Sequence, residues 1–387
     1  TTVRAAERRK AIHADALPFG VVSLDGKGTS ISACDDWYAQ RQSAGQGAPL
    51  VGVVRTITAT LISSSARPCI DVMPIPARTN EMGAFRAALE HLTDAYGSLD
   101  LFRVVTCDPW KSLARDDPWK SQKWDDPWTT LGSTRRGESL ARGDPWTTLG
   151  STRRGESQKW GDAGALSLDN ASAVRAQHLH YLFCLRATQP TLLEAARQWL
   201  GGHADDAADD VDTRRERGHL VTRRLFLGAA SDAPEGWAHL QTVVRVKTVV
   251  TDEAGRVLRA EDRYLISSLR KDALTATQWQ TLVRLRWGVE TNHQILDHAF
   301  EEDDPWKSLA RGDHPWIEQN PRGMLVVAIL RRIVYTLLAL FRGVTQRSDE
   351  RRGVPWKRLL EEVYLALLRV TDELLRSLRF RSLPLLS

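Results

Sequence analysis

The carboxylate Glu290 stands in an otherwise apolar and aromatic turn within the stretch that runs from Arg284 to Asp303. Arg286 comes four residues earlier, so in one helix the two side chains share a face. An apolar stripe follows at roughly helical spacing: Trp287, Val289, Ile295, Leu296 and Phe300. A carboxylate on the buried side of a helix is costly unless it is paired or binds a metal. The stretch therefore holds either an Arg–Glu pair on a solvated face or a metal ligand.

Two aspartates upstream favour the metal ligand, since each follows a predicted strand. The apolar strand Val21–Lys27 ends in Asp25-Gly26, which alone is typical of a turn. Leu101–Cys107 predicts another strand, with Asp108 directly after it. Two strand-end aspartates and one helical glutamate supply the oxygen ligands that hard divalent cations prefer. Two such cations, about 3.5–4 Å apart, can serve phosphoryl transfer.

Repeated segments interrupt the chain at two places. The sequence of Asp126–Ser139 returns unchanged at Asp144–Ser157, and that of Asp108–Arg115 returns at Asp304–Arg311. The copies have irregular spacing, no apolar period and many Gly, Pro and charged residues, unlike solenoid repeats. We interpret them as inserted low-complexity sequence rather than as a domain.

Removing the first insertion joins LFRVVTCD to AGALSLDNA, a continuous natural segment. Because an aspartate flanks this insertion on both sides, Asp108 and Asp162 are alternatives for the second carboxylate. Asp108 is favoured because it follows the strand directly. The expected organisation begins with a first part of the core at 1–107 and a repeat insertion at 108–162. The rest of the core, with a β-rich insertion, follows at 163–303. A short second repeat insertion at 304–313 and a helical C-terminal region at 314–387 complete the chain.

Hydrophobic periodicity predicts an α/β fold with a mixed sheet. The strands are expected at 21–27, 50–63, 69–75, 101–107, 180–186, 220–227, 240–251 and 264–269. Helices are expected at 4–17, 80–93, 169–177 and 191–200, around Glu290 and through most of 321–386, and an acidic linker is expected at 204–212.

Composition indicates a globular chain of 387 residues with a formal net charge of +5, which mildly favours a polyanionic partner. The four cysteines show no zinc spacing, and no signal peptide is visible, so we expect a cytoplasmic protein. The most apolar run, Met324–Phe341, carries Arg331 and Arg332 at its middle, which favours an amphipathic core helix over a membrane span.

Taken together, the ordered motifs resemble the DDE transposases of bacterial insertion sequences, in their H-repeat-associated branch. The resembling segments cover most of the chain outside the repeats: VVSLDGK at 21–27, LFRVVTCD at 101–108, YLFCLRATQPTLLE at 181–194, GHLVTRR at 218–224, YLISSL at 264–269, and RWGVE with FEED at 286–303.

The resemblance implies an RNase H-like core, in which the strands that carry the two aspartates lie side by side. It also implies metal-dependent strand cleavage and transfer at the element's own DNA ends. Asp25, Asp108 and Glu290 would bind two Mg²⁺ or Mn²⁺ ions, with Arg286 orienting Glu290 or touching a phosphate. The partner would be double-stranded DNA, in a bacterial cytoplasm at the nucleoid, and a homodimer in the transposition complex is left open.

Basic residues are candidates for contacts to the DNA backbone, with core or solvated roles as the alternative: Arg223, Arg224, Arg331 and Arg332. No N-terminal DNA-recognition domain is evident, from which we expect a truncated chain.

The glutamate helix departs from the related signature. The Tyr expected three residues before the signature Arg is Val283, and the Lys expected seven residues after the Glu is Asp297. The Asn usually found directly after the Glu is Thr291, followed by Asn292 and His293. Because the insertions lie next to the expected catalytic residues, an inactive remnant that at most binds DNA is the alternative function.

Overall fold

A computed structural model describes residues 2–32, 34–43, 50–107, 166–186, 189–216, 218–230, 233–286, 288–300, 302, 320–345 and 348–377. Both expected insertions, and with them Asp108 and Asp162, lie outside these residues. Helix α6 (Gly288–His298) contains position 290, but the side chain of Glu290 lies outside the described part.

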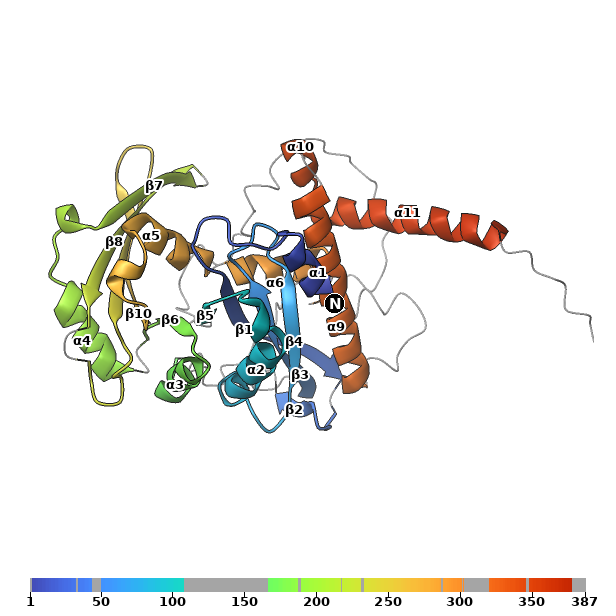
Figure 1. Cartoon of the computed structure of the whole chain (residues 1–387), viewed down its shortest axis with the longest axis horizontal. Helices are drawn as coiled ribbons and strands as arrows, with labels where there is room; N and C mark the ends of the chain where they lie inside the picture. The colour runs from blue at the N-terminus through green and yellow to red at the C-terminus, as the bar shows by residue number, and fades with distance from the viewer. Residues whose placement is uncertain are drawn as a thin grey trace, which may run out of the picture.

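Within the described residues, ten strands form one mixed sheet in the order β2-β3-β1-β5-β6-β10-β9-β8-β7, with β4 also paired to β3 (Figure 1). The pairs β1–β5 and β5–β6 are parallel, and the other pairs are antiparallel. The strands are β1 Val21–Ser32, β2 Ala39–Ser43, β3 Leu50–Leu61, β4 Cys69–Ile75, β5 Val104–Cys107, β6 His180–Cys184, β7 Asp210–Glu216, β8 His219–Ala229, β9 Thr242–Thr251 and β10 Val257–Ser267.

Helices cover both faces of the sheet, and alternation along the strands divides the core between them. Val22 and Leu24 of β1 belong to the cluster that contains side chains of α2 (Glu81–Tyr96), α3 (Leu168–Ala176) and α4 (Pro190–Leu200). Val21 points to the opposite face, where it packs in one cluster with α5 (Ala276–Leu285). The predicted α/β class with a mixed, helix-flanked sheet is confirmed.

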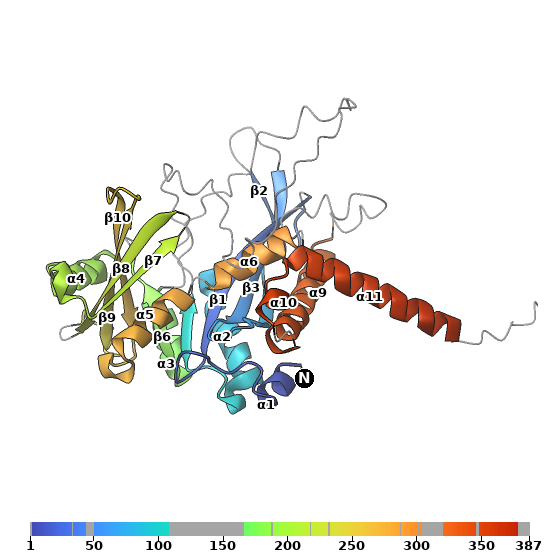
Figure 2. The same ribbon diagram turned by 90° about the horizontal axis from the view of Figure 1, so that it is seen from above.

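Helix α6 continues the cover of this second face toward α9 (Pro321–Leu340), lying over β1 and β3 (Figure 2). Its residues Val289, Asn292 and Leu296 are buried at one-turn spacing, which fixes the side that faces the sheet. We refer below to the sheet face under α5, α6 and α9 as the α6 face.

Several predicted boundaries are wrong. The helix expected at 4–17 is only α1, Thr2–Arg8, and the expected acidic linker contains the first three residues of strand β7. Strand β2 and the first half of β10 were not expected, because short charged strands lack an apolar alternation.

The C-terminal region is helical, as predicted, with α9 followed by α10 (Asp349–Arg352) and α11 (Trp356–Ser377). By length and composition, the segment Pro321–Gly343 is the one stretch of the described chain that could span a membrane. Arg332, Tyr335 and Thr336 on one side of α9 are nevertheless buried in the protein, and Thr336 donates a hydrogen bond of 2.7 Å to the carbonyl of Cys69. That packing indicates a helix of the globular body.

Candidate functional site

Polar side chains line the α6 face along the middle of β1. Ser23, Asp25 and Lys27 alternate toward this face, and the register places them opposite Thr60, Thr58 and Thr56 of β3. A row of six polar residues on a buried sheet surface is costly unless each finds a partner or a ligand. This row marks the candidate site.

Strand β1 does not end at Asp25, as the sequence suggested. It continues to Ser32 because β3 pairs with it throughout, and Gly26 lies opposite Ile57 within the ladder. A Cβ at Gly26 would collide with the side chain of Glu81, so glycine here leaves room for the start of α2 rather than making a turn. Asp25 is therefore a mid-strand carboxylate, with 11% of its side chain exposed.

Helix α6 lies along β1 in a defined register. Nδ1 of His293 lies 3.5 Å from Oδ2 of Asp25, and one turn further on Asp297 contacts the ammonium group of Lys27. Asn292 fixes the same helix to β3 by donating a hydrogen bond of 2.9 Å to the hydroxyl of Thr60. The helix that contains Glu290 is thus held against the strand that contains Asp25.

A buried charge network closes one end of the site. Lys27 lies 3.3 Å from Oε2 of Glu302, and Nη1 of Arg332 on α9 donates to Oε1 of Glu302 at 2.5 Å. Nε of Arg332 donates to the hydroxyl of Thr58 at 3.0 Å. Glu302 and Arg332 each expose only 1% of their side chains, so the network ties β1, β3, α6 and α9 together in the core.

The charge of Glu302 depends on its neighbours. Burial by itself raises the pKa of this carboxyl, but Arg332 and Lys27 outweigh burial and hold the pKa below its ordinary value. Glu302 is therefore ionised at neutral pH. Asp297, the position at which the family signature has Lys, receives its counter-charge from Lys27 on β1 instead.

The second predicted carboxylate follows β5. This strand runs parallel to β1, with Cys107 opposite Leu24, so the described part of β5 ends level with the residue before Asp25. Asp108 is the next residue in sequence, and neither Asp108 nor the alternative Asp162 lies among the described residues. The structure thus shows neighbouring strands leading to the two predicted positions.

Arg286 does not share a helix with Glu290. It caps the C-terminus of α5, and α6 begins at Gly288, so the expected i, i+4 pair belongs to two consecutive helices instead. The side chain of Arg286 is buried, with 1% of the residue exposed. Arg286 therefore lies in the core at the junction of α5 and α6.

Three of the four basic candidates for DNA contact form ion pairs within the protein, and the fourth, Arg331 on α9, is half-buried. Arg332 belongs to the buried network, and Arg223 is 12% exposed and pairs with Glu216 at 2.8 Å. Arg224 is 27% exposed and lies 3.7 Å from Asp205. Arg332 thus has a core role, and Arg223 has an ion-pair role within the β7–β8 hairpin.

Sequence reasoning missed Lys27, Asn292, His293 and Glu302 as parts of one site. Asn292 and His293 were noted only as departures from the family pattern, and Glu302 only as part of a motif. The available signal was the alternation of Ser23, Asp25 and Lys27 along an otherwise apolar strand, which indicates a polar row on a covered face.

Whether the site could hold a metal ion depends on the side-chain atoms that could bind one. Within the described residues, no group of three or more His, Cys, Asp or Glu side chains is arranged to hold an ion. Asp25 nonetheless presents a nearly buried carboxylate, and Oδ1 of Asn292 is buried with no hydrogen-bond partner in the described part of the chain. Oxygen donors of this kind are those that Mg²⁺ or Mn²⁺ prefers, so the chemistry of Asp25 is compatible with the expected ions.

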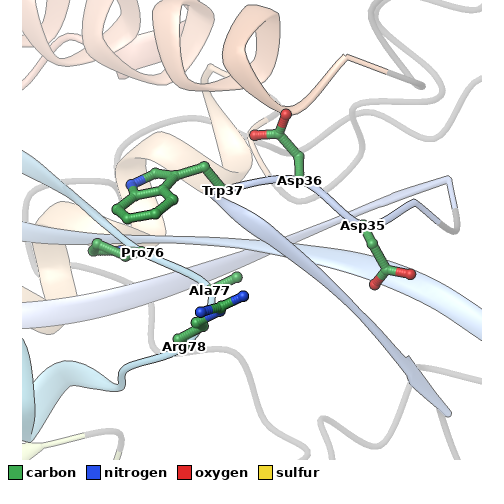
Figure 3. Close-up of a pocket in the computed structure, with 6 residues that line it drawn as sticks. All are labelled: Asp35, Asp36, Trp37, Pro76, Ala77 and Arg78. Carbon is green, nitrogen blue, oxygen red and sulfur yellow. The ribbon is translucent and has the colours of Figure 1, made fainter.

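A separate hollow of about 260 Å³ lies at the turn between β1 and β2, lined by Asp35, Asp36, Trp37, Pro76, Ala77 and Arg78 (Figure 3). The carbonyl of Trp37 accepts a hydrogen bond of 2.8 Å from the N–H of Ala77, which joins the two sides of the hollow. Asp35 pairs with Arg41 at 3.0 Å, and Asp36 accepts from the N–H of Tyr38 at 3.1 Å. These contacts are those of a stabilised turn.

A scan against family models and a search of curated proteins each find no match to this sequence.

Proposed function

We propose that the chain is a DDE transposase that cleaves and joins DNA strands with the help of divalent metal ions. The observation that carries this proposal is the docking of α6 on β1, with His293 beside Asp25 and Asp297 beside Lys27. This docking brings the helix of Glu290 to the strand of Asp25, although the two lie far apart in sequence. Without it, the resemblance would rest on separate short motifs.

Strand order supports an RNase H-like assignment of the core. Along the chain, the antiparallel strands β1, β3 and β4 come first, and β5 and β6 follow, both running parallel to β1. In the sheet these five strands have the spatial order β4-β3-β1-β5-β6. The same order is expected of the RNase H-like fold that the resemblance implies. Helices α2 and α3 then make the crossovers on one face and leave the α6 face to the site.

Register arguments support the convergence of the three carboxylates. Four residues of helix and two residues of strand both advance about 6 Å. Asp297 and His293 lie at Lys27 and Asp25, so position 290, three residues or about 4.5 Å before His293, falls between the levels of Asp25 and Ser23. We expect the carboxylates of Asp25, Asp108 and Glu290 to meet between β1, β5 and α6, within reach of shared cations.

These three carboxylates would hold two Mg²⁺ or Mn²⁺ ions. When bound, such ions activate a water or a 3′-hydroxyl and stabilise the leaving oxygen of phosphoryl transfer. The chain's own contribution is to hold the donors rigidly, because Asn292 anchors α6 to β3 and the Glu302 network anchors α6 to α9. His293, on the helix that faces β1, lies within 3.5 Å of the Asp25 carboxylate.

The test uses DNA that carries the sequences flanking the gene, with Mg²⁺ or Mn²⁺. Wild-type protein should nick or join these ends, and a chelator should stop the reaction. Glu290→Gln and Asp25→Asn should each abolish cleavage and leave DNA binding nearly unchanged, since binding rests mainly on phosphate contacts by basic residues. Glu194→Gln provides the matched control, because this carboxylate is 61% exposed on α4 and should leave cleavage intact.

Cleavage by Glu290→Gln at the wild-type rate would reject the mechanism. A chain that lacks Pro109–Asp162 tests whether the insertion blocks cleavage, because the repeats begin directly at Asp108. Cleavage by this shortened chain alone would show that the insertion blocks an otherwise competent site. Absence of cleavage by both chains on cognate ends would favour the DNA-binding remnant.

A further inference from the structure

Helix α11 is attached to the body of the protein at its first turn. Trp356 begins the helix and is half-buried, and Leu359 is 6% exposed. Every residue from Tyr364 to Leu374 is exposed, and this part of the helix projects into solvent (Figures 1 and 2). The contacts that fix α11 to the protein therefore lie around Trp356.

The indole ring of Trp356 contacts two side chains from the C-terminal end of α9 and the turn after it. The ring of Tyr335 stacks on it, with the ring centroids 5.3 Å apart and an angle of 30° between the planes. The guanidinium carbon of Arg342 lies 4.9 Å from the indole centroid, and Arg342 belongs to the π-helical turn Phe341–Thr345 that ends α9. Both contacts use the face of the aromatic ring, so they hold the indole in a defined orientation.

Tyr335 connects this first turn of α11 to the helix of Glu290. Tyr335 is 2% exposed, and its ring meets that of Phe300 edge to face with the centroids 6.3 Å apart. It belongs to a buried cluster that also contains Leu296 of α6, and Ile295 of α6 and Trp356 both pack against that cluster. The C-terminal half of α6 and the first turn of α11 thus share one apolar support.

We propose that Trp356 is a positioning residue for the carboxylate site, acting through Tyr335 and Leu296 on the helix of Glu290. Removing the indole leaves a cavity beside Tyr335, and packed side chains around a cavity relax only in part. A shift of α6 on β1 would follow, and metal ligands must lie within tenths of an ångström of their ideal distances. The consequence for metal binding rests on the proposed function, whereas the packing of α6 does not.

The polar support of α6 is separate from this apolar one. Arg332 lies one turn before Tyr335 on the same side of α9 and holds Glu302 in the buried charge network. Trp356 is uncharged and packs against the apolar cluster instead. A substitution of Trp356 therefore leaves the charges of the network in place and changes the apolar support.

The first test is hydrogen exchange of the full chain, followed by mass spectrometry. Trp356→Ala should lose protection of the amides of α6, while α2, which packs in another cluster, should keep the wild-type exchange rates. Trp356→Phe should keep the protection of α6, because a phenyl ring can still stack on Tyr335. Tyr364→Ala is the matched control, since it removes an aromatic ring that is 62% exposed on the same helix.

The second test is the binding of Mn²⁺ to the same four proteins, measured from the paramagnetic resonance signal of free Mn²⁺. Trp356→Ala should weaken binding by roughly 10-fold to 100-fold, the loss typical of residues that support metal ligands. Trp356→Phe and Tyr364→Ala should bind Mn²⁺ as the wild type does.

Unchanged exchange of α6 in Trp356→Ala, or an equal loss of protection in α2 and α6, would overturn the positioning role. Unchanged Mn²⁺ affinity in Trp356→Ala, beside a wild-type chain that binds the ion, would overturn it as well and leave the proposed function standing. A wild-type chain that binds no Mn²⁺ would instead contradict the proposed function, and with it the role of Trp356 in metal binding.

Discussion

Glu302 is the residue whose loss should most clearly reveal how the site is held together. Glu302→Gln keeps the size of the side chain but leaves Arg332, 1% exposed, and Lys27, 7% exposed, without a shared counter-charge. Removing one partner of a buried ion pair costs about 3–5 kcal/mol. With a urea dependence of roughly 3 kcal/mol per molar, the unfolding midpoint should fall by about 1 M or more.

A double substitution measures the interaction between Glu302 and Arg332 apart from the effect of each residue alone. Arg332→Met removes the charge that Glu302→Gln leaves uncompensated, so the double variant should lose less stability than the two single losses together, by about 1 kcal/mol or more. Glu194→Gln is the surface control, since its 3.8 Å pair with Arg197 is exposed and should contribute less than about 1 kcal/mol. Additive single losses, or a loss by Glu302→Gln no larger than the control, would refute the reasoning.

The pH dependence of the same variant provides a second measurement. The pKa of Glu302 lies below its ordinary value, which for glutamate is about 4.3. The stabilisation that ionised Glu302 gives the folded protein is therefore complete above that value. It is lost as the pH falls through the lower pKa of the folded state. Urea midpoints between pH 3 and 7 should fall steeply for wild type at the acid end and less steeply for Glu302→Gln.

Further predictions concern the rest of the chain. Deleting Pro109–Asp162 should preserve cooperative unfolding, and its loss would show that the repeats are part of the core. Trp279→Ala should cost about 3–5 kcal/mol, because the side chain is fully buried and donates to the carbonyl of Lys271 at 3.0 Å. Burial and Arg175 lower the pKa of His180, so wild-type stability should fall below about pH 6.5, and His180→Gln should lose that dependence in urea titrations at pH 5.5 and 8.

Local patterns were sufficient for much of the fold. The strand predicted at Cys69–Ile75 has the same bounds in the structure, and the helix predicted from Thr191 to Leu200 begins one residue earlier, at Pro190. Both segments carry their signal within themselves, as β-branched residues or as an apolar stripe at helical spacing. The mixed α/β class follows from the succession of such segments.

Other features depended on contacts that no local window contains. Asp25-Gly26 reads as a turn, but pairing with β3 and packing against Glu81 keep it in a strand. The stretch from Arg286 to Glu290 reads as one helix but divides into α5 and α6.

The sequence by itself determined which segments are strands or helices in most of the core, and that Asp25 and Glu290 are carboxylates within largely apolar stretches of sequence. Tertiary structure decided that α6 lies on β1, where Lys27 meets Asp297 and Glu302 meets Arg332. The physical reason is that periodicity reports which side of an element is buried, whereas the partner on that side is set by register and packing between distant segments.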